Sequence, residues 1–287
     1  MQMSPGLWGM LPIAVVILAF LGFRQLNRWR HARIVQRPMD PQQLALLQQG
    51  VPIYQSLSAE EQQRLQALVK LFLADKHFYG CAGLEVTERM RITIAGEACL
   101  LILNQPGAIY PGLSSILIYP SAFRVDREQH TEHGTVVTGS HRLLGESWDA
   151  GKVILSWDDV ANGVSDFSDG HNVVLHEFAH QLDSQYGTAN GSPRLRDNSY
   201  KSWARVLSSN FENLQTRALN HLPTVMDTYG ATNPAEFFAV ATETFFEKPD
   251  ALHRVRPDLY EELQRYYGCD PRLWQHGTSR AATDALH

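Results

Sequence analysis

Two histidines four residues apart, His176 and His180, constrain this chain more than any other feature of its sequence. They lie in the segment NVVLHEFAHQLD (172–183), whose apolar residues recur at the spacing of a half-buried helix. On a helix, residues four apart share one face, so both imidazoles can bind one tetrahedral Zn²⁺. Glu177 would then stand beside the metal, where it can take a proton from a metal-bound water. The alternative is an ordinary amphipathic helix with two hydrogen-bonded histidines.

A catalytic zinc ion with two histidine ligands needs a third protein ligand, and the best candidate follows later in the chain. In YGATNPAEFFAVATETFFE (229–247), Asn233 as cap and Pro234 at the first helical position predict the start of a helix. Glu236 is then a candidate ligand, although as the third helical residue it could instead close a capping box. Glu243 lies seven residues further on, on nearly the same face. It is a rival ligand or a partner that orients a ligating histidine.

Three segments together resemble a known family. HEFAHQLD, the later YGATNPAEFFAVATETFFE and the upstream LLGESWDAGKVILSW (143–157) are similar to the Mlc titration factor A family of bacterial zinc peptidases, over roughly residues 50–270. The catalytic fold of that family is similar to the protease domain of anthrax lethal factor. The resemblance implies that one Zn²⁺ per chain is held by three residues: His176, His180 and Glu236. It also implies that Glu177 is the general base and that Tyr229 stabilises the oxyanion.

Two residues near these motifs admit two interpretations each. Tyr229 would stay protonated at neutral pH and can donate a hydrogen bond to an oxyanion, or it is a tyrosine packed in a turn. Asp183 can orient a ligating imidazole, or it is a polar residue at the end of the histidine helix. His130 and His133 are predicted to lie in a loop and to bind no second metal, because no apolar periodicity around them fixes a helix.

Composition excludes several other classes of protein. The net charge is −5 and the pI is near 6.2, without a broad basic surface, so no nucleic-acid partner is expected. The chain has three cysteines, Cys81, Cys99 and Cys269. They include no Cys-x-x-Cys pair, so neither a thiolate zinc site nor a disulfide framework is indicated.

The N-terminal part of the chain predicts a membrane anchor. Residues 6–23 carry no charge and would span about 27 Å as a helix, which is close to the thickness of a hydrocarbon core. The run is followed by four basic residues, Arg24, Arg28, Arg30 and Arg33. The protein is therefore predicted to cross the inner membrane once, with the rest of the chain facing the cytoplasm. Residues 24–50 would form a juxtamembrane linker. The alternative for 6–23 is a buried or fraying helix of a protein without an anchor.

Behind the anchor, one domain is predicted over residues 51–270, followed by a flexible tail at 271–287. The expected fold is α+β, with a mainly helical N-terminal half and a zincin-like catalytic half. Ser58 and Glu61 form a capping-box pattern that starts a helix ending near Asp75. Strands are predicted at 115–119 and 153–155. In zincin-like peptidases a strand in the second position binds an extended peptide, although here it could equally be a core strand.

The sequence therefore predicts a membrane-anchored, zinc-dependent peptidase that binds peptide or protein substrates. Trimming of N-termini, as by an aminopeptidase, and internal cleavage both stay open. The alternative is a regulatory protein that keeps the zinc fold but sequesters a partner, because the partner of the resembled family is a glucose-responsive transcriptional repressor. Pure sequestration needs no general base, and for this reason the peptidase is the preferred hypothesis. A purely structural zinc is disfavoured because structural sites usually have four protein ligands.

Overall fold

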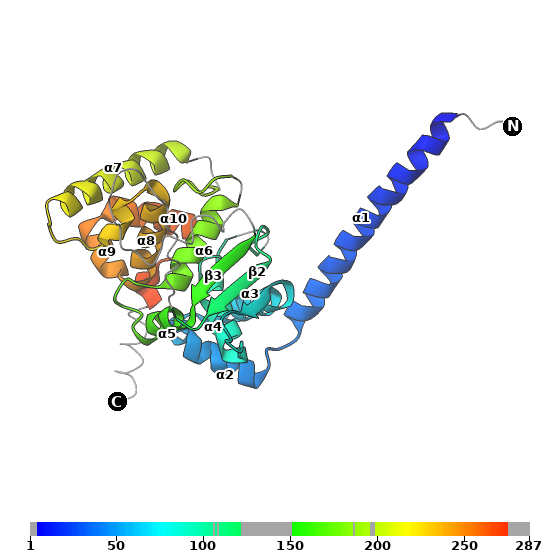
Figure 1. Ribbon diagram of the computed structural model, residues 1–287, viewed down its shortest axis with the longest axis horizontal. Helices are drawn as coiled ribbons and strands as arrows, with labels where there is room; N and C mark the ends of the chain where they lie inside the picture. The colour runs from blue at the N-terminus through cyan, green and yellow to red at the C-terminus, as the bar shows by residue number, and fades with distance from the viewer. Residues whose placement is uncertain are drawn as a thin grey trace.

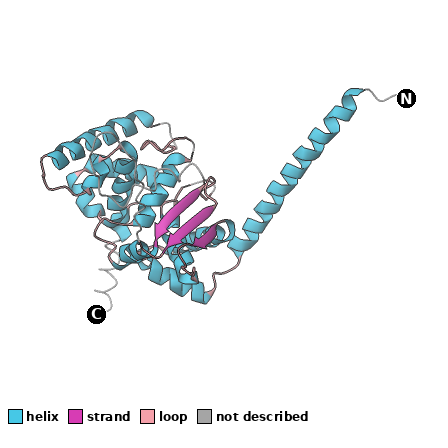
Figure 2. Cartoon of the chain, in the orientation of Figure 1, coloured by secondary structure: helices cyan, strands magenta, loops and turns pink. Residues whose placement is uncertain are grey.

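Helices dominate the structure, a computed structural model that describes residues 5–105, 107, 109–121, 151–185, 187–195 and 199–274. Figures 1 and 2 show them packed around a small sheet. The helices are α1 (Pro5–Gln36), α2 (Pro41–Gly50), α3 (Ala59–Asp75), α4 (Glu88–Leu100), α5 (Trp157–Ser165), α6 (Val173–Ser184), α7 (Tyr200–Leu219), α8 (Pro234–Glu247), α9 (Pro249–Val255) and α10 (Pro257–Tyr267). Two short 3₁₀ helices are η1 (Tyr54–Ser56) and η4 (Thr228–Ala231), and the strands are β1 (His77–Gly80), β2 (Ser115–Tyr119) and β3 (Lys152–Ser156).

The sheet is small and parallel, with the order β1-β2-β3. Parallel neighbours need a crossover, and α4 lies in the connection between β1 and β2. Ile116 and Ile118 of β2 and Val153 and Leu155 of β3 are buried, so both predicted strands form and face the core. Within the described residues β3 pairs with β2 alone, on one side.

The predicted α+β zincin-like fold preceded by a membrane helix is wrong in two respects. Among the described residues, helices occur in both halves of the chain, and the sheet adds only β1 to the two predicted strands. The reason lies in the second half, where apolar residues recur at helical spacing in α6, α7, α8 and α10, so these segments bury their apolar surfaces as helices and not as strands.

The second error is the membrane helix over residues 6–23. Among the residues that the structure describes, no helix combines the length and the apolar character that crossing a membrane requires. The apolar run and the arginines after it belong to one helix, α1, which projects from the body in Figure 1. Its basic end packs on α3, where Arg30 and His31 both contact the carboxylate of Asp75. The prediction of a single-pass inner-membrane protein, which rested on this helix, is corrected with it.

Local sequence signals explain where the helices begin. Ser58 and Glu61 form the predicted capping box of α3, with Ser58 N donating to Glu61 Oε2 over 2.9 Å and Glu61 N donating to Ser58 Oγ over 3.3 Å. Asn233 caps α8 as predicted, with its Oδ1 accepting from Glu236 N over 3.0 Å, and Pro234 follows at the first helical position. These caps fix the first turn of α8, which carries Glu236.

Residues predicted as a linker and as a tail take part in packing. The linker region 24–50 contains the end of α1 and all of α2, and Leu47 of α2 is fully buried. The tail region begins with Pro271, and Trp274 is buried against Phe246, with 6.2 Å between ring centroids. Residues 275–287 lie outside the described part of the chain.

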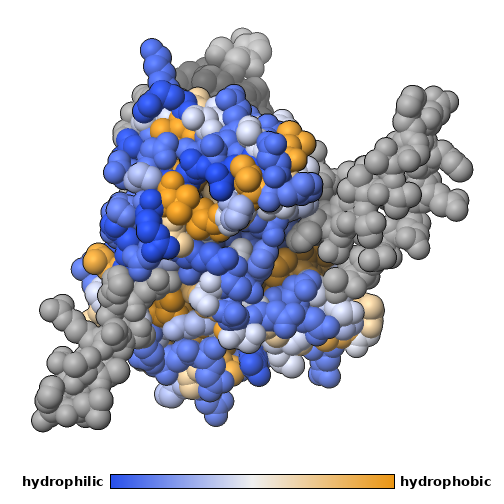
Figure 3. Space-filling view, turned by 90° about the vertical axis from the view of Figure 1, so that its left-hand side faces the viewer, coloured by the Kyte–Doolittle hydropathy of each residue, from blue (hydrophilic) through white to orange (hydrophobic). Residues whose placement is uncertain are grey.

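On one outer face, the described residues form no broad apolar surface. Figure 3 shows the side that lies to the left in Figure 1, and there apolar side chains form small separate patches among hydrophilic ones. Small scattered patches are normal on a protein surface.

The buried helix α4 contains a glycine, Gly96, at the place where α2 packs against it. A Cβ atom at this position would lie 2.5 Å from Val51 Cγ2 and 2.7 Å from Leu47 Cδ1. The close approach of α2 and α4 therefore depends on the missing side chain.

Gly96→Ala is expected to lower the free energy of unfolding by about 1–2 kcal/mol, because the strain of overpacking outweighs the helix propensity that alanine gains. Urea denaturation measures the change. Gly112→Ala is the control, since nothing lies within 4 Å of a Cβ there, and its effect should stay within about 0.5 kcal/mol. A Gly96→Ala variant as stable as the wild type would show that α2 and α4 do not pack this closely.

Candidate metal centre

Two neighbouring helices bring the three predicted ligands together. His176 and His180 lie one turn apart on α6, and Glu236 lies in the first turn of α8, which packs against α6 (Figure 1). The Nε2 atoms of the two histidines are 3.2 Å apart. Glu236 Oε2 lies 3.0 Å from the Nε2 atom of His176 and 3.3 Å from that of His180. These residues form a group whose ligand atoms can surround one metal ion.

The chemistry of these atoms fits a cation. Nδ1 of His176 lies 2.7 Å from Glu243 Oε1, and a carboxylate at this distance accepts an N–H, which leaves a lone pair on Nε2. That lone pair faces an oxygen of Glu236 and the second imidazole, and such acceptors repel unless a cation or a proton lies between them. Ligands bound to one zinc ion at about 2.0–2.1 Å lie about 3.3 Å from each other, close to the separations seen here.

The pKa values of two ligands show the same attraction for positive charge. Burial acts to lower the pKa of His176, but the charge of Glu243 and hydrogen bonds with Glu236 and Glu243 outweigh it, so this pKa lies well above its usual value. Burial acts to raise the pKa of Glu236, but hydrogen bonds with both histidines outweigh it, and the pKa lies well below its usual range. A zinc ion would replace the shared proton, so metal binding would release it.

Behind His176, a chain of buried polar groups fixes the orientation of the ring. Glu243, on α8, contacts Nδ1 of His176 with one oxygen and accepts the backbone N–H of Asn172 with the other, over 2.7 Å. The side chain of Asn172 caps α6 and donates to Glu97 Oε1 over 3.0 Å. Of the two sequence-based alternatives for Glu243, the geometry favours the partner that orients a ligating histidine. This chain ties α4, α6 and α8 together at the site.

Glu177 and Tyr229 lie beside the same group. Glu177 is buried on α6, and its charge acts on both His176 and Tyr229. Tyr229 lies on η4, where Asp227 Oδ1 accepts its backbone N–H over 2.6 Å, and its ring centroid is 6.1 Å from that of His176. Burial, the charges of Glu236 and Glu177 and a hydrogen bond with Glu236 all raise the pKa of Tyr229. The phenol therefore keeps its proton at neutral pH.

The structure favours one of the two interpretations of Asp183 and adds a buried acid, Glu97, that the sequence analysis missed. Asp183 accepts the backbone N–H groups of Gly191 and Ser192, over 2.6 and 2.8 Å, so it holds the loop after α6. Glu97 was not singled out, because it lies in an apolar stretch of α4 without a motif around it. Glu97 is fully buried, but its burial and its hydrogen-bond partner can be recognised only in the structure. His130 and His133 lie outside the described residues.

Two imidazoles and a carboxylate that can hold a metal, next to a buried glutamate, form a set of groups that metal-dependent hydrolases use. Residues 26–268 match the family described as glucose-regulated metallo-peptidase M90. The chain therefore belongs to this family of metallopeptidases, and the predicted resemblance to the Mlc titration factor A family is confirmed. A metal is implied by this membership, and zinc is the metal expected.

Three relatives match between 77% and 92% of the chain. An uncharacterized protein of Synechocystis sp. is 43% identical over 274 residues, which cover 92% of this chain and 99% of the relative. Mlc titration factor A of Serratia proteamaculans is 35% identical over 225 residues, with coverages of 77% and 85%. The protein of the same name from Pectobacterium atrosepticum is 33% identical over 261 residues, with coverages of 88% and 97%.

Burial raises the pKa of Glu97 to about 8, against a partial lowering by the hydrogen bond from Asn172. Because the folded pKa exceeds the unfolded value of 4.5, the native state holds a proton that the unfolded chain loses first. The stabilisation that comes from this bound proton is fully present below the pKa of Glu97 in the unfolded chain. It is lost as the pH rises through the pKa of Glu97 in the folded protein. Each proton contributes a slope of up to about 1.4 kcal/mol per pH unit between these limits.

Glu97→Gln is therefore expected to remove part of the decline in unfolding free energy between roughly pH 5 and pH 8. Urea denaturation of metal-free protein across this range measures it. Glu88→Gln changes an exposed acid of the same helix and should keep the wild-type slope. Parallel curves for wild type and Glu97→Gln would contradict the buried, protonated state of Glu97.

Proposed function

We propose that this metallopeptidase hydrolyses peptide bonds with Glu177 as general base, Tyr229 as oxyanion donor and His176, His180 and Glu236 as ligands of one zinc ion. The observation that carries the proposal is the convergence of the three ligand atoms within 4.8 Å of one another, with Glu177 and Tyr229 beside them. Zinc at this position would supply Lewis acidity to a carbonyl and lower the pKa of a water molecule.

The residues of the chain divide the proton and charge transfers between them. The carboxylate of Glu177 takes the proton of the attacking water and later delivers it to the nitrogen of the leaving amine. The phenol of Tyr229, protonated at neutral pH, donates a hydrogen bond to the oxygen that gains negative charge. Glu243 keeps the His176 ring in the orientation that presents Nε2 to the site. The substrates are peptides or proteins, as for any peptidase.

A role in binding a regulatory protein is a separate possibility suggested by the name of the relatives, Mlc titration factor A. Sequestration alone requires neither a buried carboxylate beside the metal ligands nor a phenol that keeps its proton there. The geometry of the site therefore favours catalysis.

Glu177→Gln should lower peptide hydrolysis at least about 100-fold while zinc stays bound, because the proton acceptor is lost and the ligands are not. Tyr229→Phe should lower kcat by roughly 100-fold or more, with a smaller change in KM, since its hydrogen bond forms in the transition state. A library of fluorogenic peptides with free and blocked N-termini detects both trimming and internal cleavage. Zinc per chain is measured on the same samples.

The control is Tyr79→Phe, which removes a hydroxyl from an exposed tyrosine on β1 and should leave turnover unchanged. Undiminished hydrolysis by a folded, zinc-loaded Glu177→Gln variant would refute the assignment of the general base. Zinc binding without hydrolysis in the wild type would favour the partner-binding alternative.

A further inference from the structure

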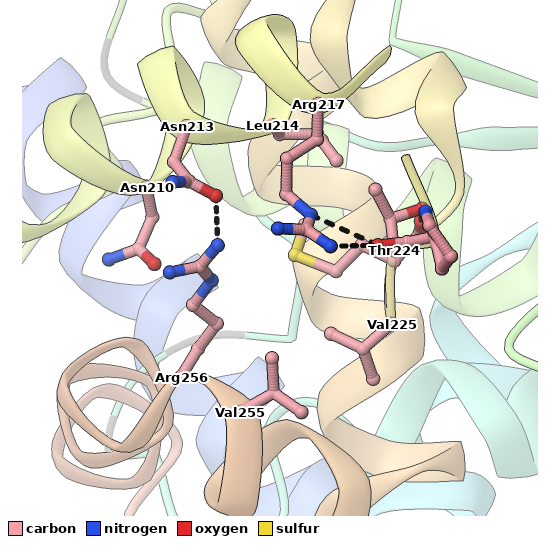
Figure 4. A pocket seen from close by; sticks show the side chains of 10 residues that line it. Asn210, Asn213, Leu214, Arg217, Thr224, Val225, Val255 and Arg256 are labelled. Carbon is pink, nitrogen blue, oxygen red and sulfur yellow. Dashed lines mark hydrogen bonds between the residues drawn. The ribbon is translucent and has the colours of Figure 1, made fainter. Parts of the chain in front are cut away.

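A second site lies away from the metal centre, between the C-terminal half of α7, the segment that follows it and the end of α9. It is a cavity of about 220 Å³. That volume is on the order of seven water molecules and is smaller than the pockets that hold drug-sized ligands. Its lining residues come from these three elements and include Asn210, Arg217, Met226 and Arg256. Figure 4 shows how these side chains lie.

Two arginines supply the charge of this pocket. In Figure 4, Arg217 from α7 and Arg256 from the end of α9 direct their guanidinium groups into the same part of the cavity. Both Nε and Nη2 of Arg217 donate to the carbonyl oxygen of Pro223, and Nη2 of Arg256 donates to Oδ1 of Asn213. These acceptors are neutral, and each guanidinium has five N–H groups, so both keep donors for a ligand.

No carboxylate among the lining residues balances the two positive charges. Asp258, an acid close to the pocket, accepts from the amide of Asn210 over 3.0 Å. Two guanidinium groups that face one cavity without an anion repel each other, and an anion between them removes this repulsion. The planar fork of a guanidinium matches a carboxylate in particular, because two parallel N–H···O bonds can form.

Apolar side chains form one part of the remaining walls, beside the polar side chains of Asn210, Asn213 and Thr224. Leu214 and Met226 are buried, and Val225 and Val255 lie together on one side of the cavity in Figure 4. A short carbon chain would bury its methylene groups against these side chains, which an inorganic anion cannot do. The charges and the apolar walls together define the ligand by its chemistry.

We propose that this pocket binds a small dicarboxylate with a short aliphatic chain, one carboxylate on Arg217 and the other on Arg256. The ligand would also contact Pro223–Met226, the segment that leads into η4 and therefore to Tyr229. Occupancy would restrain this segment. The proposal does not depend on the peptidase mechanism, because binding is measured without substrate.

Isothermal titration of the full-length protein with succinate tests the site. Binding to the wild type is expected, and Arg256→Met should weaken it at least about 10-fold, because a charge-assisted pair is lost. Arg254→Met is the matched control, since Arg254 is exposed on α9, two residues before Arg256, and does not line the pocket. The affinity of this variant should equal that of the wild type. Butyrate, with one carboxylate and the same number of carbons, should bind at least about 10-fold more weakly than succinate.

A second measurement on the wild type keeps the test independent of how the variants fold. Succinate should slow hydrogen exchange at the backbone amides of residues 224–229 and leave the amides of β1–β3 unchanged. Absence of succinate binding at about 10 mM would overturn the proposal. Equal losses of affinity in Arg254→Met and Arg256→Met would also overturn it, because they would indicate unspecific anion binding. Tighter binding of inorganic phosphate than of succinate would overturn it as well, because it would indicate a site for tetrahedral anions.

Discussion

His176 lies between two carboxylates of one helix, and the rest of the site depends on this arrangement. Glu236 approaches Nε2 at 3.0 Å and Glu243 approaches Nδ1 at 2.7 Å, from positions seven residues apart on α8. Two turns of helix span about 10 Å, which lets one helix reach both nitrogens of a ring that lies along it. The packing of α6 on α8 therefore sets both the ligand group and the orientation of its central imidazole.

This arrangement concentrates acidic groups in the interior. The fold tolerates them because protonation and hydrogen bonds from backbone amides offset the cost of burying their charges. Burial, with the nearby charges of Glu243, Glu97 and Asp169, raises the pKa of Glu247 to about 8, against a partial lowering by Asn172. Gly170 N donates to the same carboxyl over 2.9 Å. Burial thus favours the protonated forms of Glu97 and Glu247, and the charge of Glu243 acts on His176. A site that attracts a divalent cation is built without several buried, uncompensated charges.

The sequence predicts the parts of this structure that depend on local patterns. The spacing of His176 and His180, the Asn233-Pro234 cap and the capping box of α3 are all local, and each appears in the structure as predicted. The choice between Glu236 and Glu243 was open from spacing alone, because both lie on one face of α8. It needed the distances to the histidine nitrogens. The link from Asn172 to Glu97 joins residues 75 positions apart, and no local pattern specifies it.

The errors have a related cause. An uncharged run before several arginines has the composition of a membrane helix, but the end of that helix is held against α3 by contacts to Asp75, which composition does not reveal. The number and direction of the strands likewise depend on pairing between distant segments. Family membership shows what the motifs alone could only suggest, namely that the chain is a metallopeptidase.

The most direct test of the central claim is zinc K-edge X-ray absorption on the zinc-loaded chain, together with the zinc content per chain. The account predicts one zinc ion with only nitrogen and oxygen ligands at about 2.0–2.1 Å and the scattering pattern of two imidazoles. Glu236→Gln should change the spectrum and weaken zinc binding. A sulfur ligand at about 2.3 Å, or a spectrum unaltered by this substitution, would contradict the assignment of His176, His180 and Glu236.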